Sequence, residues 1–330
     1  MWPLTFKPAQ LSAVQDRELA DLVDSNSGVL SAPPYSISHW GLDVVVGGSF
    51  TIAYKGNNPK SYLTDVLGKR PVEGVSVEQI KFIKGGATPA SRTADTPPFY
   101  GGSRRIHGPL GLGGDPNKFE TCSSAFGVRS PSGTTYLVTA WHCYKYNDTR
   151  IWTNRDTNNL LIGNVTADAW NTTVKSDASF IRVNAFHRVF DGTDPNPRQS
   201  KNVVGMSLPN AGDYVCASGG YSAIRCDARV GTGADYYVAN GYSGATLHAK
   251  GSRTYSPTGA EIYGTGDSGG PIFRYTNGNT EALAYGVISA GLNGKEVACP
   301  SWRPSGVCWN EGIMALAYNL SATNSVRFTW

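Results

Sequence analysis

The chain has 330 residues, which allows about two domains, and its formal net charge is only +4. A charge this small does not indicate a nucleic-acid partner, and no apolar run reaches the roughly 18 residues that a membrane helix needs. With 39 Gly, 17 Tyr and 8 Trp but only 16% charged residues, the composition favours many short strands joined by glycine turns over a helical bundle.

Residues 1–99 contain no cysteine and predict a small mixed α/β unit. The stretch LSAVQDRELADLVD has helical spacing, and LDVVV and SFTIAY predict a hairpin over residues 42–54 with its turn at Gly47 and Gly48. A short helix at 61–67 and a strand in VSVEQIKFI complete the unit. The apolar side of the first helix consists of Leu11, Val14, Leu19 and Leu22.

The stretch GGATPASRTADTPPF is rich in Gly, Pro, Ser and Thr and indicates a linker, so we place the domain boundary near residue 99. Beyond it, apolar runs alternate with turn signals at short intervals, which is typical of antiparallel sheets or barrels. EGIMALAYNLS near the end predicts one closing helix, because Ile313, Leu316 and Leu320 share a face. The strand candidates are SAFGVRS, TYLVTAW, LLIGNVTA, ASFIRVN, DYVCASG, ATLHAKG, PIFRY and ALAYGVISAG.

Six cysteines, all after residue 121, lie in an order that suggests three local loops, although other pairings remain formally open. Their spacing matches no zinc-type cluster, so we expect no metal. An even number in a glycine-rich chain indicates disulfides and an oxidising compartment. We therefore expect a secreted protein, although the opening MWPLTFKPAQ lacks the basic-then-apolar pattern of a signal sequence. The expected disulfides are Cys122–Cys143, Cys216–Cys226 and Cys299–Cys308.

Ser268 stands in GTGDSGGP, where glycines let another molecule approach the backbone closely. Most Gly-Ser-Gly stretches are plain surface turns, and this one also fits the G-x-S-x-G elbow of lipases and esterases. A serine nucleophile needs a histidine base, and those α/β-hydrolases place the histidine after the serine. Here every histidine precedes Ser268, which leaves the two serine-protease orders. The histidines are His39, His107, His142, His187 and His248.

His142 ends the apolar strand LVTAWHC, where a disulfide from Cys143 would fix the backbone beside the imidazole. A lone histidine at a strand end is usually structural, and the other four histidines keep that interpretation. Further along, Asp177 opens the strand in KSDASFIRV, where a partly buried carboxylate can face an imidazole. An aspartate is also common at such a position for its turn alone. The order His142, Asp177, Ser268 fits the histidine–acid–serine arrangement.

LVTAWHC, DASFIRV and TGDSGGPIF together resemble the chymotrypsin-fold serine peptidases, and most of all the bacterial secreted group of streptogrisin and α-lytic protease. CSSAFGVRSPSGTTYLVTAWHC is similar to that group's cysteine-to-histidine stretch, VCASGGYSAIRC to its second disulfide loop and YGGSRRI to its mature amino terminus. The resemblance covers roughly residues 100–320 and implies an all-β fold of two antiparallel Greek-key β-barrels with a short C-terminal helix. The barrels would span about 100–197 and 198–330, and residues 1–99 weakly resemble the group's pro-region.

The resemblance also implies a catalytic site. His142 would take the proton of Ser268 as the hydroxyl attacks a peptide carbonyl, while Asp177 orients the imidazole. The backbone N–H groups of Gly266 and Ser268 would form the oxyanion hole, and Asp267 would fix their loop. Activity should rise through about pH 6–7 as the imidazole loses its proton. The strand that pairs with substrate would consist of Ser289, which also lies near Asp177, Ala290 and Gly291.

The specificity pocket is expected between residues 262–266 and 289–293, where no acidic residue is present to hold a basic side chain. Ile262, Tyr263 and Ala290 favour an apolar or medium-sized preference. Two features differ from enzymes of this fold, namely the residue before the histidine and the lack of an activation site of the animal zymogen type. Trp141 replaces the small residue that the group has before its histidine, so we expect a lateral pocket for the indole.

No basic cleavage site of the animal zymogen type occurs near residue 100, so a new terminus is not expected to insert beside Asp267. Self-cleavage near Phe99 or Tyr100 would instead release an active unit from an inhibitory and folding-assisting pro-region. The three arginines Arg104, Arg105 and Arg303 are interpreted as ordinary surface charges.

These observations predict a secreted, monomeric serine endopeptidase that hydrolyses protein or peptide substrates through an acyl-enzyme and needs no cofactor. Two alternatives remain open: a binding protein with the protease fold and impaired catalysis, and an esterase that uses the same three residues. Neither nucleic acid nor a membrane is an expected partner.

Overall fold

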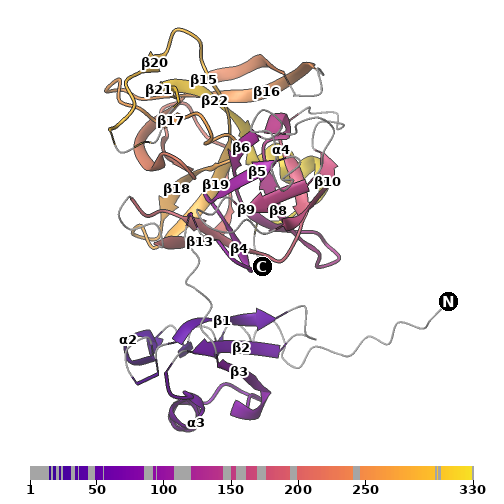
Figure 1. Ribbon diagram of the computed structural model, residues 1–330, viewed down its shortest axis with the longest axis vertical. Helices are drawn as coiled ribbons and strands as arrows, with labels where there is room; N and C mark the ends of the chain where they lie inside the picture. The colour runs from indigo at the N-terminus through magenta and orange to yellow at the C-terminus, as the bar shows by residue number, and fades with distance from the viewer. Residues whose placement is uncertain are drawn as a thin grey trace, which may run out of the picture. The chain divides into compact units, whose positions relative to one another are not determined.

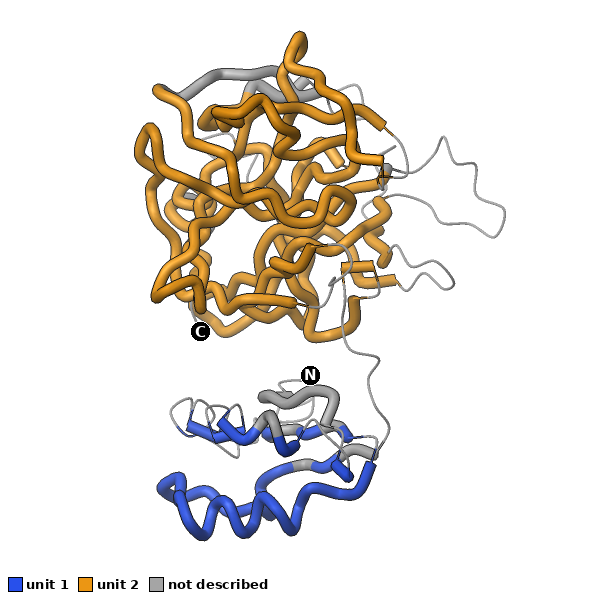
Figure 2. The backbone as a smooth tube through the Cα atoms, turned by 90° about the vertical axis from the view of Figure 1, so that its left-hand side faces the viewer, with its two compact units in different colours: residues 1–89 blue, residues 90–330 orange. Residues whose placement is uncertain are grey.

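The computed structural model divides the chain into two compact units, residues 1–89 and residues 90–330 (Figure 2). The division lies ten residues before the boundary expected from the sequence, because Arg92 and Asp95 bind residues of the second unit. The residues that the structure describes are 15, 18–19, 22–23, 25–30, 34–35, 37–43, 49–54, 56–84, 92–93, 95–107, 120–143, 150–153, 161–168, 176–193, 199–240, 246–301, 303 and 306–328.

The first unit is a three-stranded sheet with short helices, as the sequence predicts (Figure 1). Strands β1 and β2 form an antiparallel hairpin, and β3 lies parallel to β2. The second strand of the hairpin is where the sequence predicts it, but the first begins at Ile37, five residues before the predicted start, and residues 44–48 lie outside the described residues. Leu19 and Leu22 are helical and buried, whereas Leu11, Val14, Gly47 and Gly48 fall outside the described residues. The elements are α2 (Ser27–Leu30), β1 (Ile37–Asp43), β2 (Ser49–Tyr54), α3 (Lys60–Lys69), η2 (Val77–Gln79) and β3 (Ile80–Lys84).

The second unit begins with a seven-stranded sheet in which every neighbouring pair is antiparallel. Its strand order is β6-β5-β9-β10-β11-β8-β7. The first half of the second unit therefore supplies the strand ends on which two of the predicted site residues lie. The strands are β5 (Arg104–His107), β6 (Glu120–Ser123), β7 (Gly127–Arg129), β8 (Thr135–Thr139), β9 (Arg150–Thr153), β10 (Leu161–Asp168) and β11 (Ser179–Arg182).

A nine-stranded sheet of order β18-β14-β15-β16-β22-β19-β13-β12-β4 follows, in which β18 also pairs with β19. Most neighbours are antiparallel, but β13–β19 and β12–β4 are parallel. The strands are β4 (Phe99–Gly101), β12 (Ala185–Phe190), β13 (Ser200–Met206), β14 (Tyr214–Gly219), β15 (Ala223–Asn240), β16 (Thr246–Tyr255), β18 (Pro271–Thr276), β19 (Glu281–Gly291) and β22 (Glu311–Leu316).

A small third sheet and a terminal helix complete the second unit. The sheet has the order β17-β21-β20, and the helix is α4. The all-β fold with a short C-terminal helix is thus confirmed. The elements are β17 (Tyr263–Gly264), β20 (Glu296–Val297), β21 (Cys308–Trp309) and α4 (Ala317–Asn324).

The closing helix is shorter than the sequence predicts. Residues 311–316 form β22, which pairs with β16 on one side and with β19 on the other, and only residues 317–324 are helical. The apolar residues of this stretch do have helical spacing. Residues 311–316 nevertheless form a strand, because pairing with β16 and β19 outweighs the local preference for a helix.

Two charged residues upstream of residue 99 belong to the second unit. The guanidinium of Arg92, which is 3% exposed, donates to the carbonyl oxygens of Gly102, Gly219, Phe190 and Gly192 at 2.7–3.1 Å. Burial lowers the pKa of Arg92 to about 10.

The second of these residues, Asp95, pairs with Arg105 at 2.6 Å between Oδ2 and Nη2, and both side chains are buried. Arg105 is therefore not a surface charge. Phe99 is buried and donates its N–H to Asn184, so the bond between residues 99 and 100 lies inside β4. The expected cleavage at Phe99 or Tyr100 does not fit this arrangement, because a protease needs an accessible, extended segment.

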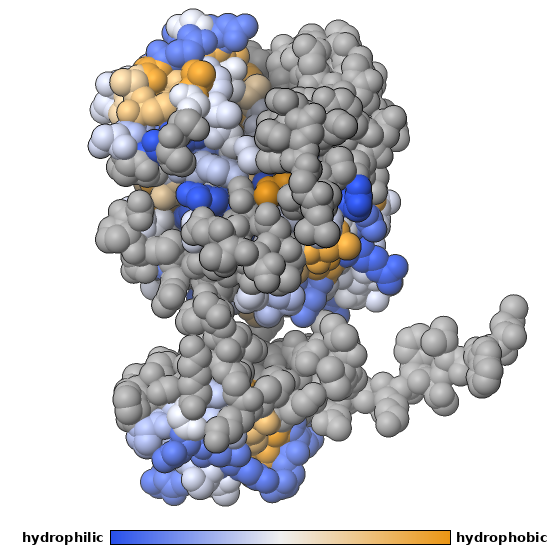
Figure 3. Space-filling view, viewed as in Figure 1, coloured by the Kyte–Doolittle hydropathy of each residue, from blue (hydrophilic) through white to orange (hydrophobic). Residues whose placement is uncertain are grey.

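The exposed surface carries isolated apolar side chains. The face drawn in Figure 3 shows small separate hydrophobic areas among hydrophilic ones. Among the described residues, the exposed large apolar side chains of the second unit include Leu161, Leu208, Tyr214 and Val307, which come from different elements. Apolar residues scattered in this way are normal for a folded domain. No helix in the described parts of the chain is long and apolar enough to cross a membrane.

Candidate active site

His142 and Asp177 are brought together by the end of β8 and the start of β11. After β8 the chain makes one 3₁₀ turn, η4 (Trp141–Cys143), and this turn carries the imidazole. The Nδ1 atom of His142 lies 2.7 Å from Oδ2 of Asp177, and the backbone N–H of His142 donates to Oδ1 at 2.9 Å. One carboxylate therefore holds both the ring and the main chain of the same histidine, which fixes the ring orientation and leaves Nε2 on the side of the ring away from Asp177.

The environment keeps Asp177 ionised although its side chain is completely buried. Burial alone would raise the pKa of the carboxyl, but the interactions with His142 and the hydroxyl of Ser289 outweigh it and hold the pKa below its ordinary value. Ser289 donates its hydroxyl to Oδ2 of Asp177, as the sequence predicted for this pair. His142 in contrast keeps 18% of its side chain exposed, so that the base is accessible and its partner is not.

The loop that carries Ser268 lies against the disulfide beside His142. Cys122 and Cys143 are bonded as predicted, and Sγ of Cys143 lies 3.9 Å from the carbonyl oxygen of Ser268. The N–H of Ser123 donates to that same carbonyl oxygen at 2.7 Å. Ser268 is itself half-buried. The third predicted residue is thus anchored by its main chain next to the turn that holds His142.

Residues 264–267 form a tight turn ahead of Ser268. The N–H of Asp267 donates to the carbonyl of Gly264 at 3.0 Å, and Gly266 has φ +90°, a left-handed conformation that only glycine adopts at little cost. A Cβ at Gly266 would also lie 2.7 Å from the ring of Tyr221. Among the described residues, no hydrogen bond engages the N–H of Gly266 or of Ser268. Two main-chain donors therefore remain available on one loop, as an oxyanion hole requires.

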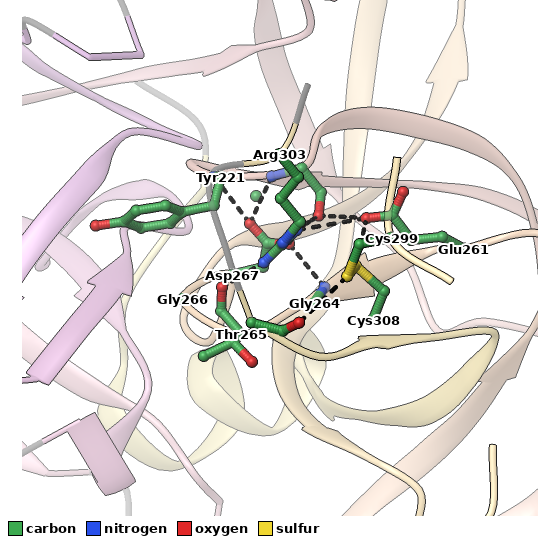
Figure 4. A network of polar contacts seen from close by, with 12 residues as sticks. Tyr221, Glu261, Gly264, Thr265, Gly266, Asp267, Cys299, Arg303 and Cys308 are labelled. Carbon is green, nitrogen blue, oxygen red and sulfur yellow. Dashed lines mark hydrogen bonds and ion pairs between the residues drawn. A yellow bond between two sulfur atoms is a disulfide. The ribbon is translucent and has the colours of Figure 1, made fainter. Parts of the chain in front are cut away.

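Asp267 fixes this turn through both of its oxygens. Oδ1 accepts from the N–H groups of Tyr221 and Ser222 at 2.9 Å, and Oδ2 accepts from the N–H of Gly264 at 2.8 Å (Figure 4). The guanidinium of Arg303 lies 3.3 Å from Oδ2, and its side chain has no exposed area. A buried carboxylate is stable only when paired and hydrogen-bonded in this way. The role of Asp267 in fixing the loop is the one expected from the sequence.

Arg303 is the principal correction to the sequence analysis, which interpreted it as a surface charge. Its guanidinium also contacts Oε1 of Glu261 at 3.4 Å and donates to the hydroxyl of Ser222 and the carbonyl of Thr265. Composition and spacing cannot reveal this burial. The one available signal was the closed loop between Cys299 and Cys308, which limits where residue 303 can lie.

Two disulfide-closed loops meet at Asp267. The Cys216–Cys226 loop supplies the two N–H donors to Oδ1, and the Cys299–Cys308 loop supplies Arg303 to Oδ2. The second loop is also attached to the turn through β21, which pairs with β17. All three expected disulfides are therefore present, and each braces a different side of the same site.

Residues 289–291 lie at the end of β19, where a described strand flanks one side only. On one side Ala290 pairs with Ile313 and Gly291 with Gly312 of β22. The pairing of β19 with β18 stops at Val287, so no described strand covers the opposite edge from Ser289 onward. A free edge can take an extended peptide as an added strand.

Trp141 does not displace the histidine. Its side chain is 7% exposed, while the imidazole that follows it keeps its contact with Asp177. The buried position agrees with the lateral pocket expected from the sequence.

His107 is a second buried histidine close to the site. It lies on β5 with both ring nitrogens buried, and burial together with the charges of Arg105 and His142 lowers its pKa to about 3. In the described part of the chain it groups with Cys122 and Cys143 within 4.8 Å. These cysteines are bonded to each other, and a disulfide offers no thiolate for a metal. The group is therefore structural.

Solved structures of serine proteases are similar to this chain. A glutamic acid specific serine protease is 20% identical, over 69% of this chain and 98% of its own, with a TM-score of 0.45. A Nocardiopsis protease is 21% identical over 70% and 98% of the two chains with a TM-score of 0.42, and Thermobifida fusca protease A is 20% identical over 69% and 96% with a TM-score of 0.43. No protein-family model and no curated protein matches the chain. The likeness is one of fold and carries no conclusion about activity.

Proposed function

We propose that residues 90–330 are a serine endopeptidase in which His142, Asp177 and Ser268 form the catalytic triad. The observation that carries the proposal is the buried Asp177 carboxylate, which holds both the ring and the N–H of His142 next to the anchored loop of Ser268. The two unused N–H groups on that loop give the second requirement, a place for the negative charge of a tetrahedral intermediate.

In the proposed reaction, neutral His142 accepts the proton of the Ser268 hydroxyl as Oγ attacks the carbonyl carbon of a peptide. Asp177 stabilises the imidazolium that forms, and the N–H groups of Gly266 and Ser268 bind the oxyanion. The imidazolium then donates its proton to the leaving amine, which departs and leaves an acyl-enzyme. Water, activated by the same histidine, hydrolyses the ester bond. The substrate backbone lies along the free edge of residues 289–291.

Replacement of Ser268 tests this function directly. In protein from which the first unit has been removed, Ser268→Ala should abolish labelling by a fluorophosphonate probe and lower the hydrolysis of casein and of a simple peptide ester by at least about 10³-fold. Ser132→Ala, at an exposed serine of the 131–132 turn, is the matched control and should behave like the parent chain. If Ser268→Ala keeps the labelling and the turnover of the parent, the proposal is wrong.

The same assays separate the two alternatives. If Ser268 does not react with the fluorophosphonate in folded protein from which the first unit has been removed, the chain is a binding protein with this fold. A chain that hydrolyses the ester and leaves casein intact is an esterase. The two N–H groups argue against a binding protein but would serve ester and peptide hydrolysis alike. The uncovered edge of β19 favours peptide cleavage, because an extended peptide can pair with it.

The remaining expectations extend the proposal. Three disulfides fit a protein that works in an oxidising compartment, so we infer that the peptidase acts outside the cell as a monomer. The first unit would act as a pro-region that assists folding and inhibits the peptidase until it is removed. Comparison of casein hydrolysis before and after removal of the first unit tests this, since equal activity would contradict an inhibitory role.

A further inference from the structure

Three segments surround the position that a substrate side chain would take beside Ser268. The turn of residues 264–267 follows β17, the free edge of β19 ends at Gly291, and β22 backs β19 through the pair of Gly291 with Gly312. If the substrate backbone lies on β19 and its carbonyl oxygen points at the turn, the side chain next to that carbonyl enters between β17 and β19. The content of this space therefore sets which substrates fit.

Tyr263 crosses this space from one wall to the other. Its side chain starts on β17 and is 1% exposed, and its Oη donates to the carbonyl of Ala290 on β19 at 3.3 Å. The same oxygen lies 3.1 Å from Oγ1 of Thr254 on β16. Burial raises the pKa of the phenol, so the hydroxyl stays protonated and remains a donor. The ring is thus held at both ends.

The two glycines that would otherwise leave room here face aromatic side chains. A Cβ at Gly312 would lie 1.7 Å from Oη of Tyr263, and a Cβ at Gly291 would lie 2.1 Å from the ring of Trp309. Tyr263 and Trp309 stand directly opposite each other on β17 and β21, so their side chains project from the same face of the pair. The room that Gly291 and Gly312 provide is taken by the protein itself.

We propose that Tyr263 and Trp309 fill the primary specificity pocket, so that the peptidase cleaves after small residues such as glycine, alanine and serine. This inference rests on the proposed function and narrows the apolar or medium-sized preference that the sequence favoured. The ring is buried and packed between β17, β16 and β19, so a larger substrate side chain could enter only by displacing the ring from its packing, which penalises larger side chains.

A matched set of substrates and variants tests the preference. Peptide anilides that differ only in alanine, leucine or phenylalanine before the scissile bond should show kcat/KM for alanine above that for phenylalanine by about 100-fold or more. Tyr263→Ala should lower this ratio about tenfold or more, whereas Tyr263→Phe, which keeps the ring, should preserve it. A parent chain that cleaves after phenylalanine as well as after alanine, or a ratio unchanged in Tyr263→Ala, overturns the proposal.

A second measurement does not depend on catalysis. Tyr263→Ala should bind 4-methylphenol in the vacated space, seen as a rise in the thermal midpoint, and neither the parent chain nor Tyr263→Phe should do so. If Tyr263→Ala shows no such rise, the ring does not fill an enclosed space and the proposal fails.

Fluorophosphonate labelling of Ser268 in the same samples tests the proposed function separately. Binding of 4-methylphenol without labelling overturns the peptidase and with it the substrate preference, but shows that the space is filled. Labelling of Ser268 without binding of 4-methylphenol to Tyr263→Ala supports the proposed peptidase. That result overturns only the proposal that Tyr263 and Trp309 fill the specificity pocket.

Discussion

Asp177 and Asp267 are equally buried carboxylates with opposite kinds of partner. Asp177 holds an imidazole, whose proton can move at working pH, and leaves part of that imidazole exposed. Asp267 holds three main-chain N–H groups and a guanidinium, which does not take part in proton transfer. Burial alone therefore does not assign a role to a carboxylate. The partner decides whether the charge serves a proton transfer or the shape of a loop.

The two carboxylates also differ in how the fold brings each one to its partner. His142 and Asp177 lie at the ends of strands in the same sheet, so pairing of β8 with β11 already brings them close. Asp267 and Arg303 are joined only through the loops closed by Cys216–Cys226 and Cys299–Cys308. Changes to the loops should therefore affect Asp267 and spare Asp177.

The largest expected effect is on the Asp177 side. Asp177→Asn should lower kcat by about 10⁴-fold, because the amide no longer stabilises the imidazolium or fixes the tautomer of His142. Steady-state kinetics with a peptide ester measures this. Asp191→Asn, which changes a buried carboxylate that accepts from Tyr275, is the control and should leave kcat unchanged. A small loss of kcat in Asp177→Asn would contradict a role of Asp177 in proton transfer and would assign to both carboxylates the same structural role.

On the Asp267 side, Arg303→Met should lower the free energy of unfolding by about 3–5 kcal/mol, because it leaves the buried Asp267 without its guanidinium partner, while Glu261 keeps only Arg225. Urea unfolding measures this. The disturbed turn should also lower kcat by about 10²–10³-fold with little change in KM, since the oxyanion contacts develop in the transition state.

The double variant Arg303→Met with Asp267→Asn should recover part of the lost stability, because one uncompensated charge is gone. Arg303→Lys should not restore the parent, since an ammonium cannot reproduce the several contacts of the planar guanidinium. Full stability in Arg303→Met would show that Arg303 is not a structural partner of Asp267.

Removal of either loop disulfide should have a smaller effect. Cys299→Ala with Cys308→Ala should lower the free energy of unfolding by about 2–3 kcal/mol and lower kcat, and Cys216→Ala with Cys226→Ala should act alike. The NMR resonance of the proton between His142 and Asp177 should stay in place in both. Leu320→Ala, a buried change in α4 with a comparable cost of about 2–5 kcal/mol, should leave kcat unaltered.

The smallest expected effect is on how the free energy of unfolding depends on pH. The pKa of Asp177 is lower in the folded chain than in the unfolded one, so the unfolded state binds the proton first as the pH falls. The contribution of Asp177 to stability is therefore complete above its ordinary pKa of about 3.9 and is lost as the pH falls through the lower folded value. Urea unfolding between about pH 2 and pH 6 should show the parent and Asp177→Asn converging at the acid end. A constant difference would contradict the assignment.

The pairing of His142 with Asp177 could be anticipated from the sequence, because motifs in a fixed order and local cysteine pairs constrain it. The strands around the site were also recognisable, since alternation between apolar runs and turns is a local signal. Residues 311–316 were not, because their strand conformation depends on β16 and β19, which lie far away in the chain.

The burial of charged side chains was the main feature of the structure that the sequence did not predict. Arg303, Arg105 and Arg92 are ordinary arginines in sequence, and nothing local distinguishes a guanidinium in solution from one enclosed by carbonyls and a carboxylate. The position of the Tyr263 side chain could not be predicted from the local sequence either. Its place near the specificity pocket followed from its position before Ser268, but the filling of that pocket depends on Thr254, Ala290 and Gly312 meeting around one hydroxyl.

The pairing of Asp95 with Arg105 has a practical consequence for preparing the peptidase. A shortened gene that starts at codon 100 would encode Arg105 without its carboxylate and would omit the Arg92 guanidinium, which binds four carbonyls from three segments of the chain. Such a product should express poorly or precipitate. A gene that retains Arg92 and everything after it encodes the Asp95 partner of Arg105 and the four carbonyls that Arg92 binds, and is the version to purify.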